Sequence, residues 1–378
     1  MAEQLHRDIV QEDPRFLREQ IITYLGNKRA LLDFIGSAVE LVKKELNTDK
    51  LDIVDLFSGS GVVSRYFKKD ARHLYSNDLE PYCETINRCY LTNASEVDTH
   101  ALQRYYEDIC AQLDSRPLEQ GFISRLYAPH DDENIKPGER VFYTSRNAMY
   151  IDTARQALDT LPEPYKTFLL APLLFEASVH TNTSGVFKGF YKNSASGIGQ
   201  FGGDGQNALS RIIADISLQL PIFSRLECDV QVLREDAGRL AGLLPTVDLV
   251  YMDPPYNQHP YGSNYFMLNL INDYRCPDSI SRVSGIPRHW NRSQFNSKKS
   301  SMAAMSRLCH SLKARYLLIS FSNDGFISQD EMVELLSGIG DVRVFDTEYN
   351  TFRGCRNLGS RDIHVKELLY LVTTRHKG

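Results

Sequence analysis

The sequence contains no apolar run of roughly 18 residues, the length that a membrane-spanning helix requires. Its first residues, MAEQLHRDIVQEDPRF, are rich in charge and lack the apolar core of a secretory signal. Repeats and low-complexity tracts are also absent. We therefore expect neither export nor membrane insertion, and we predict a cytoplasmic protein without a membrane partner.

Cysteine is scarce, because the 378 residues include only seven, scattered along the chain. None belongs to a CxxC pair or has the spacing of a zinc site, and an odd number does not suggest a disulfide framework. We interpret these cysteines as reduced thiols, and we expect no metal site.

The composition excludes the disordered and fibrous classes. Hydrophobic residues make up 42% of the chain and charged residues 24%, as in ordinary globular proteins. A length of 378 residues suits one large domain with an insertion, or two domains that share an extended core.

Acidic residues are missing from two stretches, although the formal net charge is -5. Residues 281–301 carry five basic side chains and no carboxylate, and residues 351–361 carry Arg353, Arg356 and Arg361, again without a carboxylate. An evenly spread negative charge would argue weakly against a polyanionic partner. This uneven distribution leaves nucleic acid open as a partner.

The first third of the chain has an α/β pattern. Residues 51–57 (LDIVDLF) read as a buried strand, SGSG as a tight turn and 62–70 as a helix start. A second short strand, 73–78, ends on Asp78. This order is typical of a nucleotide-binding α/β half.

The pattern changes from about residue 85 to 225, where helical stretches and a polar, Gly-rich segment from Gly185 to Gly205 predominate. We interpret this part as an insertion. The β pattern then resumes in five stretches: 228–233, 247–252, 314–322, 342–349 and 367–374.

The most informative motif is Asp253-Pro254-Pro255-Tyr256, directly after the apolar strand 247–252. It places a carboxylate, two stiff residues without a backbone donor and an aromatic ring at a strand's carboxyl end, where open α/β sheets bind ligands. The alternative is a strand that merely ends in a proline turn, with Asp253 as a turn former.

With this motif the chain resembles the amino-methyltransferases of DNA, and specifically the Dam-like D12 class of adenine-N6 enzymes, in which a recognition domain interrupts the catalytic core. The resemblance covers most of the chain except the insertion. It implies S-adenosyl-L-methionine as methyl donor and double-stranded DNA as partner. It also admits a cognate restriction endonuclease, which the sequence does not decide.

The chemistry explains the residue types of the catalytic motif. The adenine amino nitrogen is a poor nucleophile, because its lone pair is delocalised into the ring. Hydrogen bonds to Asp253 and to the carbonyl of Pro254 would localise that lone pair as positive charge develops. Tyr256 would stack on a base that is flipped out of the duplex and would favour a sulfonium donor beside its ring.

Further segments match donor-site motifs of the family, beginning with the glycine turn after the first strand. Asp55, Phe57, Gly59 and Gly61 resemble the FxGxG motif, whose glycines let the backbone approach the methionine moiety. A plain turn between strand and helix is the alternative. A dinucleotide oxidoreductase fits less well, since Ser64 replaces the third glycine of GxGxxG.

Tyr24 and Lys28 match the family's YxGxK motif, which closes over the donor and the target pocket; a glycine turn with an exposed lysine is the alternative. Asp78 resembles the acid that binds the donor ribose, unless it only caps a helix. We assign Asp236 to the amino group of the donor adenine, with an exposed turn carboxylate as the alternative. Asp253 is also expected to face the donor.

Other segments are candidates for DNA contact. Tyr261 and Asn264 resemble the segment that lines the target pocket, although a Tyr-rich helix start is equally compatible. In the insertion, Lys188, Lys192 and Asn193 have side chains of the types that read base edges.

The resemblance assigns the arginines at 353, 356 and 361 to a DNA-contacting loop, and a solvated hairpin tip is the alternative. The basic stretch 281–301, with Trp290 and Phe295 among its cations, would grip phosphates or form a solvated face.

Asp253 favours adenine as the target, since enzymes acting on cytosine N4 more often carry Ser there and RNA adenine enzymes more often carry Asn. Cys276 precedes its proline, so the Pro-Cys nucleophile of cytosine C5 enzymes is missing. The alternatives left open are a cytosine-N4 or RNA enzyme and a catalytically silent nucleic-acid-binding protein.

Taken with the resemblance, the pattern predicts a seven-stranded, mostly parallel Rossmann-like methyltransferase sheet with helices on both faces and an antiparallel last strand. Residues 1–84 and 226–378 would form the catalytic domain, and 85–225 an inserted, mainly helical target-recognition region. We predict methylation of adenine N6 in a specific duplex sequence, by base flipping and direct in-line transfer.

Overall fold

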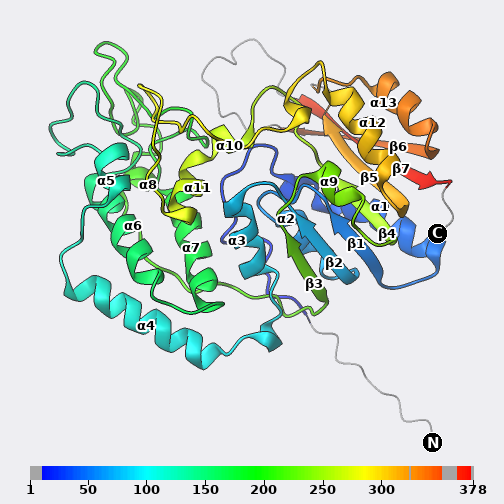
Figure 1. Cartoon of the computed structure of the whole chain (residues 1–378), viewed down its shortest axis with the longest axis horizontal. Coiled ribbons are helices and arrows are strands. Elements are labelled where there is room, and N and C mark those ends of the chain that lie inside the picture. The colour runs from blue at the N-terminus through cyan, green and yellow to red at the C-terminus, as the bar shows by residue number, and fades with distance from the viewer. Residues whose placement is uncertain (1–10, 323–324, 351–363, 376–378) are drawn as a thin grey trace, which may run out of the picture.

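The computed structural model describes residues 11–322, 325–350 and 364–375. Figure 1 shows a twisted sheet with flanking helices on one side of the molecule and a helical lobe on the other. Nothing in the described residues forms a helix long and apolar enough to cross a membrane.

The sheet has seven strands in the order β3-β2-β1-β4-β5-β7-β6. The neighbouring strands from β3 to β5 are parallel, whereas β7 runs antiparallel to both β5 and β6. The strands are β1 Leu51–Asp55, β2 Ala71–Asn77, β3 Asp229–Leu233, β4 Val247–Met252, β5 Ala314–Ser322, β6 Gly340–Asn350 and β7 His364–Thr374. This arrangement confirms the predicted fold class, including the antiparallel last strand.

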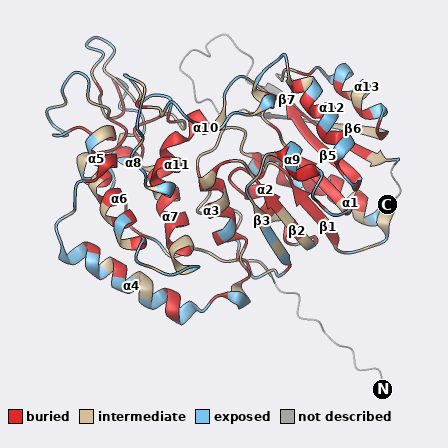
Figure 2. Ribbon diagram, in the orientation of Figure 1, coloured by how far each residue is buried: buried red, intermediate tan, exposed pale blue. Residues whose placement is uncertain are grey.

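Helices cover both faces of the sheet because the central strands are apolar on both sides. On β4, Leu249 and Tyr251 point toward the helices α1 and α2, while Val250 and Met252 point toward α9, α12 and α13. Figure 2 shows these strands as buried. The helices are α1 Leu32–Leu46, α2 Val62–Phe67, α9 Ala237–Ala241, α12 Ser301–Ser311 and α13 Gln329–Ser337.

A separate hydrophobic core holds the helical lobe together. Between β2 and β3 the chain forms α3 Pro81–Tyr90, α4 Thr99–Ser115, α5 Phe122–Tyr127, α6 Ser145–Leu158, α7 Tyr165–Val179 and α8 Leu209–Ile213. After β4 it forms α10 Tyr261–Asn264 and α11 Phe266–Asp273. Residues of α3 and α11 belong to the same core as α4 to α7. The chain directly after the catalytic motif is therefore packed into the helical lobe.

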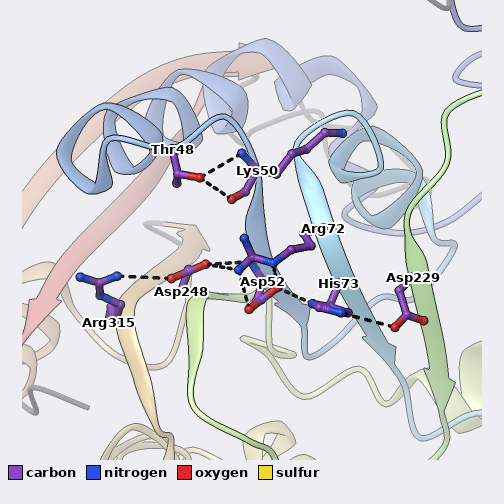
Figure 3. A network of polar contacts seen from close by, with 8 residues as sticks. All are labelled: Thr48, Lys50, Asp52, Arg72, His73, Asp229, Asp248 and Arg315. Carbon is purple, nitrogen blue, oxygen red and sulfur yellow. Dashed lines mark hydrogen bonds and ion pairs between the residues drawn. The ribbon is translucent and has the colours of Figure 1, made fainter.

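A polar network joins the amino ends of neighbouring strands (Figure 3). Asp52 on β1 accepts two hydrogen bonds from Arg72, at 3.0 and 2.8 Å, and lies 2.6 Å from Nδ1 of His73. Asp248 on β4 pairs with Arg72 at 3.5 Å and with Arg315 on β5 at 3.6 Å. These residues lie at the opposite end of the strands from the carboxyl ends, where the sequence places its candidate ligands.

Candidate active site

A pocket of about 910 Å³, including its opening to solvent, lies at the carboxyl ends of β1, β2 and β4. Most of the donor-site and catalytic residues predicted from the sequence line it: Tyr24, Lys28, Asp55, Phe57, Gly59, Asp78, Asp236, Asp253 and Pro255. Tyr261, which was predicted to line the target pocket, lines it as well. The fold thus brings together residues that are up to 237 positions apart (24 to 261) in the chain.

The glycine turn after β1 is shaped by two left-handed residues. Gly59 has φ +50°, and a Cβ added to it would lie 2.8 Å from the Tyr24 ring. Gly61 has φ +77°, and a Cβ there would lie 2.1 Å from Oδ1 of Asn87. Gly59 lines the pocket, whereas Gly61 sits behind it as the N-cap of α2. Only glycine satisfies both the backbone angle and the space at these positions.

The carboxylate of Asp253 is held by Lys28. The ammonium nitrogen of Lys28 lies 3.2 Å from Oδ1 of Asp253 and 2.7 Å from Oε1 of Glu367 on β7. Ser320 on β5 donates to the same Glu367 oxygen at 2.5 Å. The Lys28 and Glu367 side chains are 3% and 0% exposed, and that of Asp253 is 19% exposed. One buried cation therefore faces two carboxylates, of which only Asp253 opens to the pocket.

Burial and neighbouring charges change the pKa values of this group. Burial raises the pKa of Asp253 to about 7, with Lys28 opposing the shift and Glu367 adding to it. Burial lowers the pKa of Lys28, but the charges of Asp253 and Glu367 outweigh it and raise that pKa well above its usual value. Lys28 is therefore charged at neutral pH, while Asp253 titrates near it.

The rest of the catalytic motif is fixed by packing. Pro254 is buried, and the Tyr256 ring lies 6.0 Å from that of Phe321 at an interplanar angle of 66°. The carbonyl of Tyr256 accepts a hydrogen bond from the Phe326 amide at 3.0 Å. These contacts hold the turn after β4 against the end of β5.

Three stacked tyrosines form one wall of the pocket and its support. Tyr24 stacks with both Tyr261 and Tyr265 at centroid distances of 4.8 Å, and the Tyr261 and Tyr265 rings are 6.0 Å apart. The Tyr261 hydroxyl donates to the carbonyl of Leu25 at 3.0 Å, and the Tyr265 hydroxyl accepts from the Leu25 amide at 2.6 Å. The YxGxK segment is thereby fixed to α10 and to the start of α11.

Further carboxylates surround the same pocket. Burial raises the pKa of Asp55 to about 7, although Ser64 donates to its Oδ2 at 2.6 Å. Its other oxygen, Oδ1, is buried and has no hydrogen-bond partner among the described residues. Burial also raises the pKa of Glu80 to about 7, against a hydrogen bond from Asn269. A ligand that carries positive charge would favour the ionised forms of these buried carboxyl groups.

Two of the predicted acids also have structural roles. Asp78 accepts from the backbone amides of Gly59 and Glu80, both at 2.9 Å, and burial raises its pKa. Asp236 caps α9 by accepting from Gly238 and Arg239. Both still line the pocket, so their assignment to the donor stays a prediction.

The side chains predicted to contact DNA lie in different environments, some exposed and some buried or engaged in local contacts. Lys188 is exposed, and its ammonium lies 3.2 Å from Nδ1 of His259. The Lys192 ammonium lies over the Phe190 ring at 5.1 Å. The Asn193 side chain accepts from the amides at 195 and 196, so it shapes its own turn. Asn264 is 1% exposed and does not line the pocket. Arg353, Arg356 and Arg361 lie outside the described residues.

Sequence reasoning missed several residues of the site. Glu367 could have been recognised from the sequence, because it is the one acidic residue at the start of the otherwise apolar stretch ELLYLV. Asn77 precedes the predicted Asp78 and donates to the carbonyls of Leu56 and Glu235, which joins three strand ends. Four pocket residues come from the basic stretch and were not expected in a donor pocket: Asn291, Ser293, Phe295 and Asn296.

Among the residues that the structure describes, no three His, Cys, Asp or Glu side chains are grouped so that they would hold a metal ion. The expectation that no metal is needed stays a prediction.

Comparison with known proteins identifies the family. A family model described as D12 class N6 adenine-specific DNA methyltransferase matches residues 24–335. The chain is 27% identical over 338 residues to the type II methyltransferase M.NlaIII of Neisseria lactamica, a match that covers 88% of this chain and 92% of that protein.

Two other relatives show similar identity. The type II methyltransferase M.CviAII of Paramecium bursaria Chlorella virus 1 is 30% identical over 358 residues, which is 93% of this chain and 98% of that protein. The type II methyltransferase M.FokI of Planomicrobium okeanokoites is 25% identical over 354 residues, which is 90% of this chain and 51% of that protein.

The family model spans every residue that lines the pocket. The predicted family and enzyme class are confirmed: this chain belongs to the D12 class of N6 adenine-specific DNA methyltransferases.

Proposed function

We propose that the chain transfers a methyl group from S-adenosyl-L-methionine to the N6 amino group of adenine in a specific double-stranded DNA sequence, by base flipping and direct in-line transfer. The observation that supports this proposal is the Lys28–Asp253 ion pair of 3.2 Å, beside the Gly59 turn that lines the same pocket. A methyl donor and an acceptor amino group would meet there.

The residues of the pocket fit the donor. A cationic sulfonium and an α-ammonium group match the carboxylates of Asp55, Asp78 and Asp253, and Oδ1 of Asp55 lacks another partner among the described residues. The missing side chain at Gly59 leaves room for close approach of a ligand to the backbone. When bound, S-adenosyl-L-methionine supplies an electrophilic methyl group.

Different residues of the pocket would bind different parts of the donor. Asp78 would accept hydrogen bonds from the ribose hydroxyls and Asp236 from the amino group of the donor adenine. Phe57 would offer an apolar surface, because its ring lines the pocket and packs edge-on against Phe295 at 5.5 Å. The proposal includes no metal.

The target amino group would be activated by Asp253 and Pro254. The carboxylate and the Pro254 carbonyl accept its two hydrogen bonds, which localises the lone pair on the attacking nitrogen. The ionised carboxylate of Asp253 is the stronger acceptor and stabilises the developing positive charge, so a pKa of about 7 favours the working form at neutral pH and above. Pro255 stiffens the turn, and Tyr256 would stack on the flipped base.

Lys28 and Glu367 would act as positioning residues. Lys28 compensates the buried charge of Asp253 and fixes one carboxylate oxygen, while Glu367 fixes Lys28 from the opposite side. Because neither group needs to touch the reacting atoms, their contribution is to the orientation and ionisation of Asp253.

Target recognition would come from residues 85–225, which form most of the helical lobe, while residues 1–84 and 226–378 supply the catalytic domain. Lys188 and Lys192 would contact the DNA, and Tyr261 lines the pocket that would receive the base. The roles of Asn193, Asn264 and the arginines at 353, 356 and 361 stay predictions. The type II relatives favour a cognate restriction endonuclease as partner, and a cytoplasmic location is part of this proposal.

The test is incubation with labelled S-adenosyl-L-methionine and unmethylated genomic DNA, followed by sequencing with detection of modified bases. We expect methyladenine in one recurrent motif. Methylcytosine, or label only in RNA, would contradict the proposal. Donor binding without transfer to any DNA would support a silent binding protein. Asp253→Ala should abolish transfer and leave donor binding largely intact.

A further inference from the structure

The segment between α11 and α12, residues 274–300, connects the two halves of the molecule, and we call it the bridging segment. In Figure 1 it is the yellow chain that runs from the helical lobe to the sheet. On the lobe side, Tyr127 donates to the Gly285 carbonyl at 2.8 Å and Arg140 to the Arg282 carbonyl at 3.2 Å. The segment is therefore anchored on the lobe by its backbone, which leaves its charged side chains available.

On the sheet side, the bridging segment forms part of the pocket. Phe295 is 7% exposed, and Asn291 donates to the carbonyl of Leu79 at 3.3 Å. The Asn296 side chain donates at 2.9 Å to the carbonyl of Asn257, the residue that follows Tyr256. One stretch of backbone thus touches both the donor pocket and the catalytic turn.

Basic side chains dominate the bridging segment, whose sequence contains one carboxylate, Asp278. From Ser279 to Ser322 the sequence contains no Asp or Glu. Six cations of the segment are exposed, and within the described part of the chain none of them forms an ion pair: Arg275, Arg282, Arg288, Arg292, Lys298 and Lys299. By contrast, the exposed Arg72, Arg88 and Arg146 each pair with a carboxylate.

The side chain of one of these cations is held in a defined orientation. The Arg292 guanidinium lies over the Trp290 ring at 4.2 Å, between the pocket residues Asn291 and Ser293. A stacked guanidinium keeps its donors free for an anionic partner, because a ring offers no acceptor oxygen. Positive charge is therefore presented beside the mouth of the pocket.

We propose that the bridging segment is a phosphate clamp that binds the backbone of duplex DNA next to the flipped base. This inference rests on the proposed function and deepens it, since it assigns the sequence-independent part of DNA affinity to one segment. Backbone phosphates fit the observed features, because they are anions spaced along a path and need no base-reading geometry. The hydrogen bond from Asn296 to the carbonyl of Asn257 places the clamp directly beside the turn of the proposed catalytic motif.

The salt dependence of DNA binding tests the clamp. Each phosphate contact contributes about 0.9 to the slope of log affinity against log salt concentration. We expect the triple variant Arg288→Gln/Lys298→Gln/Lys299→Gln to lower that slope by roughly 2 to 3 and to weaken duplex binding at least tenfold at about 50 mM salt. Fluorescence anisotropy with a labelled duplex that contains the methylated motif measures both.

The matched control removes three exposed cations that lie outside both the bridging segment and residues 85–225: Lys44→Gln/Lys313→Gln/Arg375→Gln. It should keep the slope of the unaltered protein. Calorimetry with S-adenosyl-L-methionine verifies that both variants are folded and bind donor. An unchanged slope in the clamp variant, with normal donor binding, overturns the clamp alone. If the unaltered protein neither binds nor methylates duplex DNA, the proposed function fails instead.

Discussion

The ammonium group of Lys28 lies 2.7 Å from Oε1 of Glu367, although 338 residues separate the two in the chain. Both side chains are buried, and the second contact of Lys28 is Asp253. The Asp253 carboxylate, which we propose to be catalytic, is therefore one member of a charged triad, and its ionisation depends on the other two members.

Variants of Lys28 and Glu367 should move the pH dependence of catalysis in opposite directions. Lys28 lowers the pKa of Asp253 and Glu367 raises it, on top of the larger effect of burial. The acidic limb of the single-turnover rate, near pH 7 in the unaltered protein, should move up by roughly one to three units in Lys28→Met. In Glu367→Gln it should move down. Two shifts in the same direction would exclude this coupling, and Arg72→Gln serves as a control with an unshifted limb.

Asp253→Asn should abolish methyl transfer but stabilise the fold above neutral pH. The pKa of Asp253 is raised to about 7 in the folded chain, so ionising it costs stability as pH rises from its usual value of 3.8. The variant removes that cost, which is about 1.4 kcal/mol for each unit by which folding raises the pKa of Asp253. Its gain should be full above pH 7 and should shrink as pH falls toward 4. Thermal unfolding of both proteins at pH 5 and pH 8 checks this, and an equal gain at the two values would be inconsistent with it.

Donor binding should release protons near neutral pH. The pKa values of Asp55, Glu80 and Asp253 are all raised to about 7, chiefly by burial, and a cationic ligand favours their ionised forms. Affinity for S-adenosyl-L-methionine should therefore rise between pH 6 and 8, by up to about tenfold per pH unit for each proton released. Calorimetry in two buffers with different ionisation enthalpies counts the protons. S-adenosyl-L-homocysteine, which lacks the sulfonium charge, should release fewer, and equal release would argue against the assignment.

Gly59→Ala should weaken donor binding by about tenfold or more. Its φ of +50° costs an alanine about 1–2 kcal/mol, and the new Cβ would collide with the Tyr24 ring. The control is Gly242→Ala, where a Cβ would meet only the Arg239 carbonyl at 4.0 Å. Donor titration of both variants decides whether the turn at Gly59 requires glycine.

Arg72→Gln should lower stability slightly and leave methylation unchanged. Although burial raises the pKa of Asp52, hydrogen bonds from Arg72 and His73 outweigh it and lower that pKa. This contribution is present above the unfolded pKa of Asp52 and is lost as the pH falls through the lower folded value. Because the Arg72 side chain is 50% exposed, solvent screening limits the loss to roughly 0.2–1 kcal/mol near pH 7. Chemical denaturation at pH 7 and pH 3 should show a larger difference at pH 7 than at pH 3.

The sequence alone determined the fold class and the position of the predicted catalytic motif at a strand end, because both rest on local patterns. Alternating and continuous apolar stretches predicted the seven strands, and the glycine turn and Asp253 follow two of them directly. Ligands of parallel sheets bind at the carboxyl ends of strands, so a motif there predicts a site without further information.

Only the tertiary structure decided which distant residues complete that site. Glu367 reaches Lys28 because β7 pairs antiparallel with β5, which no short-range pattern encodes. The bridging segment lines the pocket because its ends are anchored to the helical lobe and to the catalytic turn. Asn193 and Asn264 had suitable side chains for DNA, yet one shapes its own turn and the other is buried. Residue type predicts what a side chain is able to bind, whereas packing decides whether the side chain faces the ligand.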